Sequence, residues 1–155
     1  MLKNIGIFLT FLVFNFGALG IGSVLMGSSP LENTWYQELN LAPWTPPGWV
    51  FGAAWTTIMI LFALYMTVIF RKNPTKQNGL IYVIHLLLNI GWNPVFFQFH
   101  QLFSGLVILI ALFVVILLTH HKNFKWNDKS ILLITPYLIW LCIAFLFNFY
   151  AFLFN

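Results

Sequence analysis

The sequence predicts an all-α integral membrane protein, a bundle of five transmembrane helices with a long first loop rich in Trp and Pro. Of its 155 residues, 61% are hydrophobic and only 6% are charged, whereas soluble domains carry about 25% charged residues. A soluble fold of this composition would expose large apolar patches and aggregate. Within a bilayer, a spanning segment must pair its own backbone polar groups, so the long apolar stretches are expected to be helices.

Five apolar stretches have about the 20 residues needed to cross the hydrocarbon core. They cover residues 5–26, 49–70, 79–99, 102–119 and 131–154, within one membrane domain over residues 1–155. The first continues past Gly20 and is too long for the apolar part of a signal peptide, so we expect it to be retained as a span. The fourth is the shortest, and a tight turn near His100 separates it from the third.

The charged residues divide between the two sides of this bundle. With five spans, the N-terminus and the second and fourth connections share one side, which holds every Lys and Arg of the chain. These residues are Lys3, Arg71, Lys72, Lys76, Lys122, Lys125 and Lys129. Because basic loops mark the cytoplasmic side, we predict a cytoplasmic N-terminus and an external C-terminus. The basic residues form no continuous stripe, so the net charge of +4 does not indicate a nucleic-acid partner.

The segment 35–55, which runs from the first loop into the second span, has the most unusual composition. It contains four of the seven tryptophans and three of the seven prolines, and it carries no Lys or Arg. Proline restricts the backbone, and Trp rings offer large flat contact surfaces. The segment therefore predicts part of a binding site for a large, flat, apolar ligand, on the external side.

The third span places His85, Asn89 and Asn93 on one helix face, at intervals of four residues. Polar side chains in a span usually face the bundle interior or a cavity. For Asn93, a pocket wall and interhelical hydrogen bonding are equally supported, whereas hydrogen bonding is favoured for Asn89. For His85, a role in helix packing is favoured over ligation of a haem iron. Pro94 cannot donate to the carbonyl of Ile90, which favours a kink.

The fifth span places Trp140, Ala144 and Asn148 on one face by the same spacing. Trp140 lies deep in the span, whereas interfacial Trp anchors lie at the ends of spans. Its position therefore favours a pocket over the usual aromatic belt, and the small Ala144 would allow a ligand or a backbone to approach closely.

Other residues of the spans are expected to serve packing or the membrane interface. Gly17, Gly20 and Gly22 predict close helix packing. Cys142 is expected to be a small buried hydrophobic residue. A helix C-terminus or a lipid headgroup would account for His120 at the end of the fourth span.

The sequence lacks the residues that acid–base catalysis, metal binding and phosphate binding require. The spans contain no Asp or Glu, and the chain shows no Cys/His metal spacing and no Gly-rich phosphate loop. Catalysis by a strong general base and ion-coupled transport are therefore not expected. No metal site and no required cofactor is predicted.

Three blocks of residues together resemble the TspO/MBR family, the tryptophan-rich sensory proteins related to the mitochondrial translocator protein, or peripheral benzodiazepine receptor. The first block runs from Trp35-Tyr36 through Pro43-Trp44-Thr45-Pro46-Pro47 to Trp55. The second is Asn89-Ile90-Gly91-Trp92-Asn93 followed by Phe96-Phe97, and the third is Pro136-Tyr137 with Trp140, Ala144 and Asn148. Chain length, five spans and the order of the blocks agree, so the resemblance covers nearly the whole chain.

The resemblance implies a five-helix bundle, often a homodimer, whose pocket opens toward a first loop that acts as a lid. Family ligands are porphyrins, haem, sterols and synthetic isoquinoline or benzodiazepine drugs. The positions that it assigns to ligand binding are Tyr36, Pro47, Phe51, Trp55, Met59, Asn93, Phe96, Trp140 and Ala144. Animal members carry a sterol pattern in which Lys or Arg follows a Tyr. Tyr150 is followed by neither, so cholesterol is not expected, and the composition suggests a bacterial inner-membrane member.

The leading hypothesis is therefore a membrane receptor or sensor that binds tetrapyrroles such as protoporphyrin IX or haem, and other lipophilic molecules, as ligands. A light-dependent porphyrin-degrading enzyme is an alternative, because Tyr36, Trp55 and Trp140 match positions linked in the family to porphyrin breakdown. A porphyrin or lipid transporter and a purely structural partner-binding protein also stay open.

Overall fold

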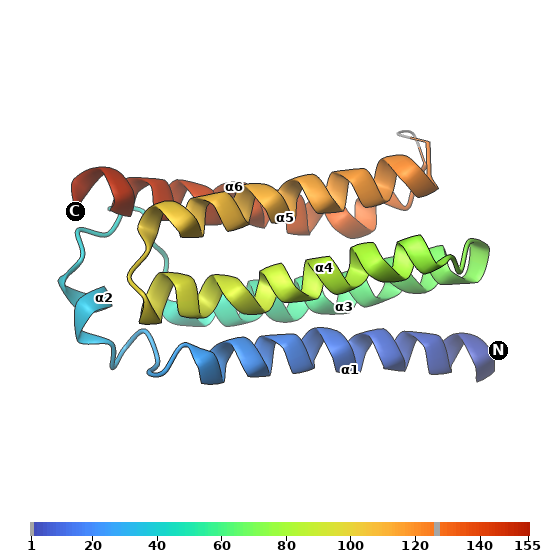
Figure 1. Ribbon diagram of the computed structural model, residues 1–155, viewed down its shortest axis with the longest axis horizontal. Coiled ribbons are helices and arrows are strands. Elements are labelled where there is room, and N and C mark those ends of the chain that lie inside the picture. The colour runs from blue at the N-terminus through green and yellow to red at the C-terminus, as the bar shows by residue number, and fades with distance from the viewer. Residues whose placement is uncertain (1, 126–127) are drawn as a thin grey trace.

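The computed structural model describes residues 2–125 and 128–155 and contains five helices long and apolar enough to cross a membrane. The elements are α1 (Leu2–Leu25), α2 (Thr34–Glu38), α3 (Gly48–Lys72), α4 (Lys76–Asn93), the π-helix η1 (Pro94–Gln98), α5 (Leu102–Asn123) and α6 (Ile131–Phe154). The short α2 lies in the first loop, as Figure 1 shows. The predicted fold class, an all-α membrane bundle, is confirmed.

The long helices form a closed ring. Helix α1 packs against α3 and α4, α4 against α5, α5 against α6, and α6 against α3. Their axes run nearly parallel, and the two ends of the chain lie at opposite ends of the bundle (Figure 1). We call the end that holds the α3–α4 turn and the α5–α6 loop the basic half, and the end that holds α2 the lid half.

The helix ends extend the predicted spans where polar side chains support them. Helix α4 begins three residues before the predicted 79, because the Thr75 hydroxyl caps it by accepting from Asn78 N at 3.2 Å. Helix α5 continues past the predicted 119 to Asn123, whose Nδ2 donates to Asn78 Oδ1 at 3.1 Å and to Thr119 O at 2.8 Å. At 22 residues the fourth span is one of the two shortest, equal in length to the first span.

The break expected at Pro94 takes the form of a π-helix. Pro94 has no N–H to donate, and the chain widens there so that Phe99 N donates to Pro94 O at 2.9 Å, five residues back. His100 then adopts a positive φ of 56° before α5 begins. Buried Phe96 and Phe97 point inward from this segment, so η1 turns aromatic rings toward the bundle interior.

The basic half is filled by a packed aromatic core. Phe62 is 2% exposed, and its ring lies 4.4 Å from His85 and 5.5 Å from Tyr137, centroid to centroid. Two hydrogen bonds join polar groups of this core across helices. Tyr82 OH donates to Asn15 Oδ1 at 2.8 Å, and Asn15 Nδ2 donates to the carbonyl of Met59 at 3.0 Å. Hydrogen bonds therefore tie α1, α3 and α4 together.

Three expectations about packing need correction. A Cβ on Gly22 would lie 2.6 Å from Asn93 Nδ2, which confirms close packing there. A Cβ on Gly17 or Gly20 would meet no described atom of another helix within 4 Å. That prediction is wrong for Gly17 and Gly20 because they lie on the outer face of α1. His120 lies in the last turn of α5, as the helix C-terminus alternative expected, but it is fully buried, with Nδ1 3.3 Å from Tyr65 OH, so the lipid headgroup alternative is wrong.

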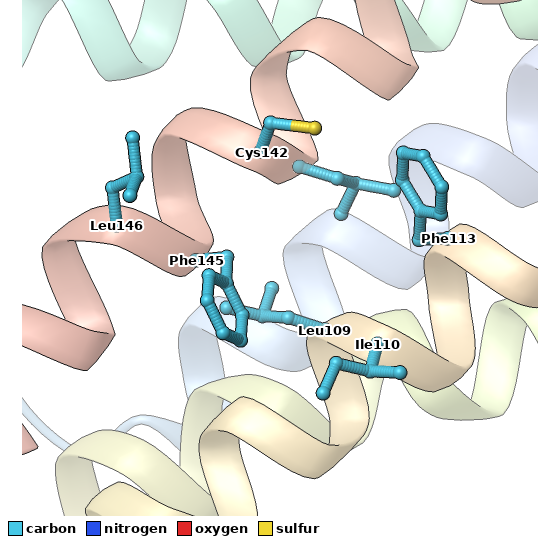
Figure 2. A pocket seen from close by; sticks show the side chains of 7 residues that line it. Leu109, Ile110, Phe113, Cys142, Phe145 and Leu146 are labelled. Carbon is cyan, nitrogen blue, oxygen red and sulfur yellow. The ribbon is translucent and has the colours of Figure 1, made fainter.

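Cys142 is exposed, so the expectation of a buried thiol is also wrong. Figure 2 shows its side chain at a groove between α5 and α6 together with Leu109, Ile110, Phe113, Phe145 and Leu146. In a membrane protein an apolar, outward-facing groove of this kind contacts lipid chains, and a thiol is tolerated there because it is nearly apolar.

Candidate ligand-binding cavity

The segment 26–47 between α1 and α3 forms a lid that is anchored first on η1 and the turn after it. Asn33 caps α2 by accepting from Tyr36 N at 3.0 Å, and its Nδ2 donates to Phe97 O at 3.2 Å. The ring of Trp35 stacks on His100, with centroids 4.2 Å apart and planes 14° apart. This end of the lid is therefore held by one hydrogen bond to η1 and one stacked ring pair.

The second part of the lid is anchored on the end of α6. Asn40 N donates to Asn155 Oδ1 at 2.8 Å, and Asn40 Nδ2 donates to Phe154 O at 3.0 Å. Trp44 meets Tyr150 edge to face at 5.4 Å. We call the Asn40 hydrogen bonds the latch, because they join the lid to a helix that is far away in the sequence.

Beneath the lid lies a cavity of about 840 Å³, bounded by all the helices. Cavities of ~300–1,000 Å³ are the usual size for sites that enclose drug-sized ligands. Among the described residues that line it, none is Asp, Glu, Lys, Arg or His. The cavity is therefore suited to an uncharged, largely apolar molecule.

Most of the residues assigned to ligand binding from the sequence come together at this cavity. Those that line it are Tyr36, Phe51, Trp55, Asn93, Phe96, Trp140 and Ala144. Two do not. Met59 is 1% exposed and belongs to the packed core, one turn of α3 beyond Trp55. Pro47 is the residue before α3, where its neighbours Pro46 and Gly48 line the cavity instead.

Aromatic rings from separate elements make opposite walls. Phe51 of α3 meets Trp140 of α6 edge to face at 5.4 Å. On the other side, Tyr36 of the lid lies 5.2 Å from Phe97, and Trp92 stacks on Phe96 at 5.0 Å. Burial raises the pKa of the Tyr36 hydroxyl above its ordinary value of 10.0, so this phenol stays neutral at physiological pH.

The polar face of α4 divides between core and cavity. Asn89 Nδ2 donates to Tyr137 OH at 2.7 Å, which confirms its expected interhelical hydrogen bond, and Asn89 also lines the cavity. His85 Nε2 lies 3.0 Å from the same hydroxyl and the side chain is 1% exposed. This confirms the packing role of His85. In residues 2–125 and 128–155, no three His, Cys, Asp or Glu side chains cluster as metal ligands would.

Some lining residues had no assigned role from the sequence. Trp92 and Asn148 line the cavity, although the sequence named them only within the blocks of the family resemblance and, for Asn148, on a helix face. Phe16, Leu19 and Ser23 of α1 also line it. A polar Ser23 in an apolar span was the available signal for the α1 wall, whereas Phe16 and Leu19 look like any lipid-facing residue.

The fold and the cavity together define an integral membrane protein with an aromatic, uncharged cavity closed by a lid. Residues 8–153 match the model of the TspO/MBR family, and the chain belongs to this family.

Relatives from distant organisms cover most of the chain. It is 30% identical to the tryptophan-rich sensory protein of Cereibacter sphaeroides, over 94% of this chain and 89% of the relative. It is 29% identical to the tryptophan-rich protein TspO of Chlorobaculum tepidum, over 84% and 86%. It is also 30% identical to the translocator protein of Bos taurus, over 74% and 71%.

Proposed function

We propose that this protein is a membrane receptor or sensor that binds flat apolar ligands, tetrapyrroles such as protoporphyrin IX or haem, in the cavity beneath the lid. The observation that carries the proposal is that Tyr36, Trp55 and Trp140, from three separate elements, line one uncharged cavity. The name of the Cereibacter sphaeroides relative, tryptophan-rich sensory protein, agrees with such a role.

The physical basis is stacking combined with desolvation. Aromatic pairs contribute about 0.5–1.5 kcal/mol beyond the burial of their area. A tetrapyrrole macrocycle is flat and could contact the α3–α6 wall and the lid–η1 wall at once. Because the lid is already held by the latch and by the Trp35–His100 stack, little ordering entropy is lost on binding.

The test is a titration of the purified protein with protoporphyrin IX in the dark, followed by Trp fluorescence. We expect saturable quenching, and Trp55→Phe and Trp140→Phe should each weaken binding by about 2- to 10-fold, which corresponds to one aromatic contact. Trp49→Phe is the matched control, because Trp49 is 74% exposed and lies outside the cavity lining. Absence of saturable quenching, or equal effects of all three variants, would contradict the proposal.

Light-dependent breakdown of bound porphyrin is a second candidate, favoured by the oxidisable rings of Tyr36, Trp55 and Trp140 around one cavity. Such photochemistry needs no acid–base residue, which agrees with the uncharged lining. Illumination of the complex should give one defined product in the wild type and much less in Trp140→Phe. Bleaching at the rate of free porphyrin, in both proteins alike, would exclude it.

We further propose a cytoplasmic N-terminus, an external lid and a bacterial inner-membrane location. Arg71, Lys72, Lys76 and Lys122 lie in the basic half, at the helix ends opposite the lid. Basic residues favour the cytoplasmic side. Labelling of single cysteines introduced at Glu38 and at Lys76, in a Cys142→Ala background, tests this in intact cells: a membrane-impermeant reagent should modify only the first.

A further inference from the structure

Three described residues of the cavity lining carry buried polar atoms that are not paired with the protein, namely Thr45 of the lid and two residues of the long helices, Trp92 and Asn148. Asn148 of α6 is 2% exposed, and both atoms of its carboxamide are buried without a hydrogen-bond partner among the described residues. The same holds for the indole Nε1 of Trp92 on α4. Both residues line the cavity.

The two groups lie next to each other because α5 has a glycine beside them. A Cβ on Gly105 would lie 2.6 Å from Asn148 Nδ2 and 3.5 Å from Trp92 Nε1. The missing side chain leaves room for the carboxamide between α5 and α6. A donor from α4 and a carboxamide from α6 therefore meet on one patch of wall.

Helix packing does not account for Asn148. The other two asparagines deep in the bundle are paired across helices, Asn15 with Tyr82 and Asn89 with Tyr137. Buried polar groups are nearly always hydrogen-bonded, and an unpaired one is costly. An unpaired amide and indole beside a cavity gain a hydrogen-bond partner when their side chains turn toward a polar ligand that enters it.

Resting on the proposed function, we propose that Trp92 and Asn148 form a polar subsite that binds an uncharged carboxamide at the edge of the ring ligand. Trp92 offers one donor, and Asn148 offers donors and an acceptor whichever way its amide is turned. The ligand carbonyl would accept from Trp92 and Asn148, and the ligand N–H would donate to Asn148. At this buried subsite an ionised carboxylate is disfavoured, since no cationic side chain is present in the described lining to compensate it, so the propionate groups of protoporphyrin IX or haem would lie away from it.

The test compares protoporphyrin IX diamide with protoporphyrin IX dimethyl ester, which lacks the N–H donor, by Trp quenching in the dark. The wild type should bind the diamide about tenfold more tightly, the value of one hydrogen bond to a buried, otherwise unpaired partner. Asn148→Leu, which has a similar shape, should abolish this preference by weakening the diamide about tenfold more than the ester. Trp92→Phe should weaken both probes, because both present a carbonyl.

A second variant tests the geometry without changing either polar residue. Gly105→Ala places a methyl group against the Asn148 amide and should reduce the preference for the diamide. Gly20→Ala is its matched control, because nothing described lies within 4 Å of that position. The ligand-free Asn148→Leu protein should unfold at the same temperature as the wild type or higher, whereas loss of a helix-packing asparagine would lower it.

The outcomes separate the two proposals. If neither probe gives saturable quenching, the proposed function fails. If both bind wild type and Asn148→Leu with the same ratio of affinities, the cavity binds porphyrins but the subsite is wrong. A lower unfolding temperature of ligand-free Asn148→Leu would likewise assign Asn148 to packing and overturn the inference.

Discussion

The basic half and the lid half of this bundle use the same kinds of side chain in opposite ways. In the basic half, aromatic rings pack on one another, and the buried carboxamide of Asn15 is paired with Tyr82. In the lid half, rings surround about 840 Å³ of space, and the polar groups of Trp92 and Asn148 are unpaired. The difference indicates that stability is concentrated at one end of the helices and binding at the other.

The largest expected effect separates the two halves directly. Phe62→Ala should destabilise the protein by about 3–5 kcal/mol, because it leaves a void in a packed core. Phe51→Ala removes a half-buried ring that already borders a cavity, so its loss of stability should be clearly smaller. Thermal unfolding in detergent measures both. Protoporphyrin IX affinity should change in the reverse order, and parallel changes in stability and affinity would refute the division.

A smaller effect is expected where the halves meet. Tyr137→Phe removes the hydroxyl that accepts from Asn89 and bonds His85, leaving both without this partner. The expected loss is about 1–3 kcal/mol in unfolding free energy. Tyr150→Phe is the matched control, since Tyr150 is a half-buried residue near the end of α6. An equal loss in the two variants would mean that the shared hydrogen bond adds nothing.

The smallest effect concerns the latch. Asn40→Ala deletes the hydrogen bond to Phe154 O on an exposed surface, where such bonds contribute about 0.5–1 kcal/mol. Protoporphyrin IX should dissociate about 2- to 5-fold faster, with the unfolding temperature unchanged. Stopped-flow fluorescence measures the rate. Asn4→Ala, at the opposite end of the bundle, is the control, and equal dissociation rates would show that the latch does not hold the lid closed.

Five spans, the sidedness of the charges and the aromatic lid could be predicted from the sequence. The hydrophobic length of a span and the charge of a loop are properties of one stretch of sequence, so both can be judged without knowing which helices are neighbours. Regular spacing also placed Trp140 and Ala144 on the face that lines the cavity. The family resemblance assigned both Trp55 and Met59 to the ligand site, but only Trp55 lines the cavity. One helix turn separates the cavity wall from the packed core, and no residue type marks that boundary.

Only the tertiary structure decided the ring order of the helices, the outward direction of Gly17 and Cys142, and the contrast between paired Asn89 and unpaired Asn148. In water, a polar face shows which side of a helix is outside. In lipid both the outer and inner faces are apolar, so the pattern of one helix does not say which neighbour it meets. By itself the sequence therefore determined which segments span the membrane and which end is charged, and packing between helices determined which side chains are left to meet a ligand.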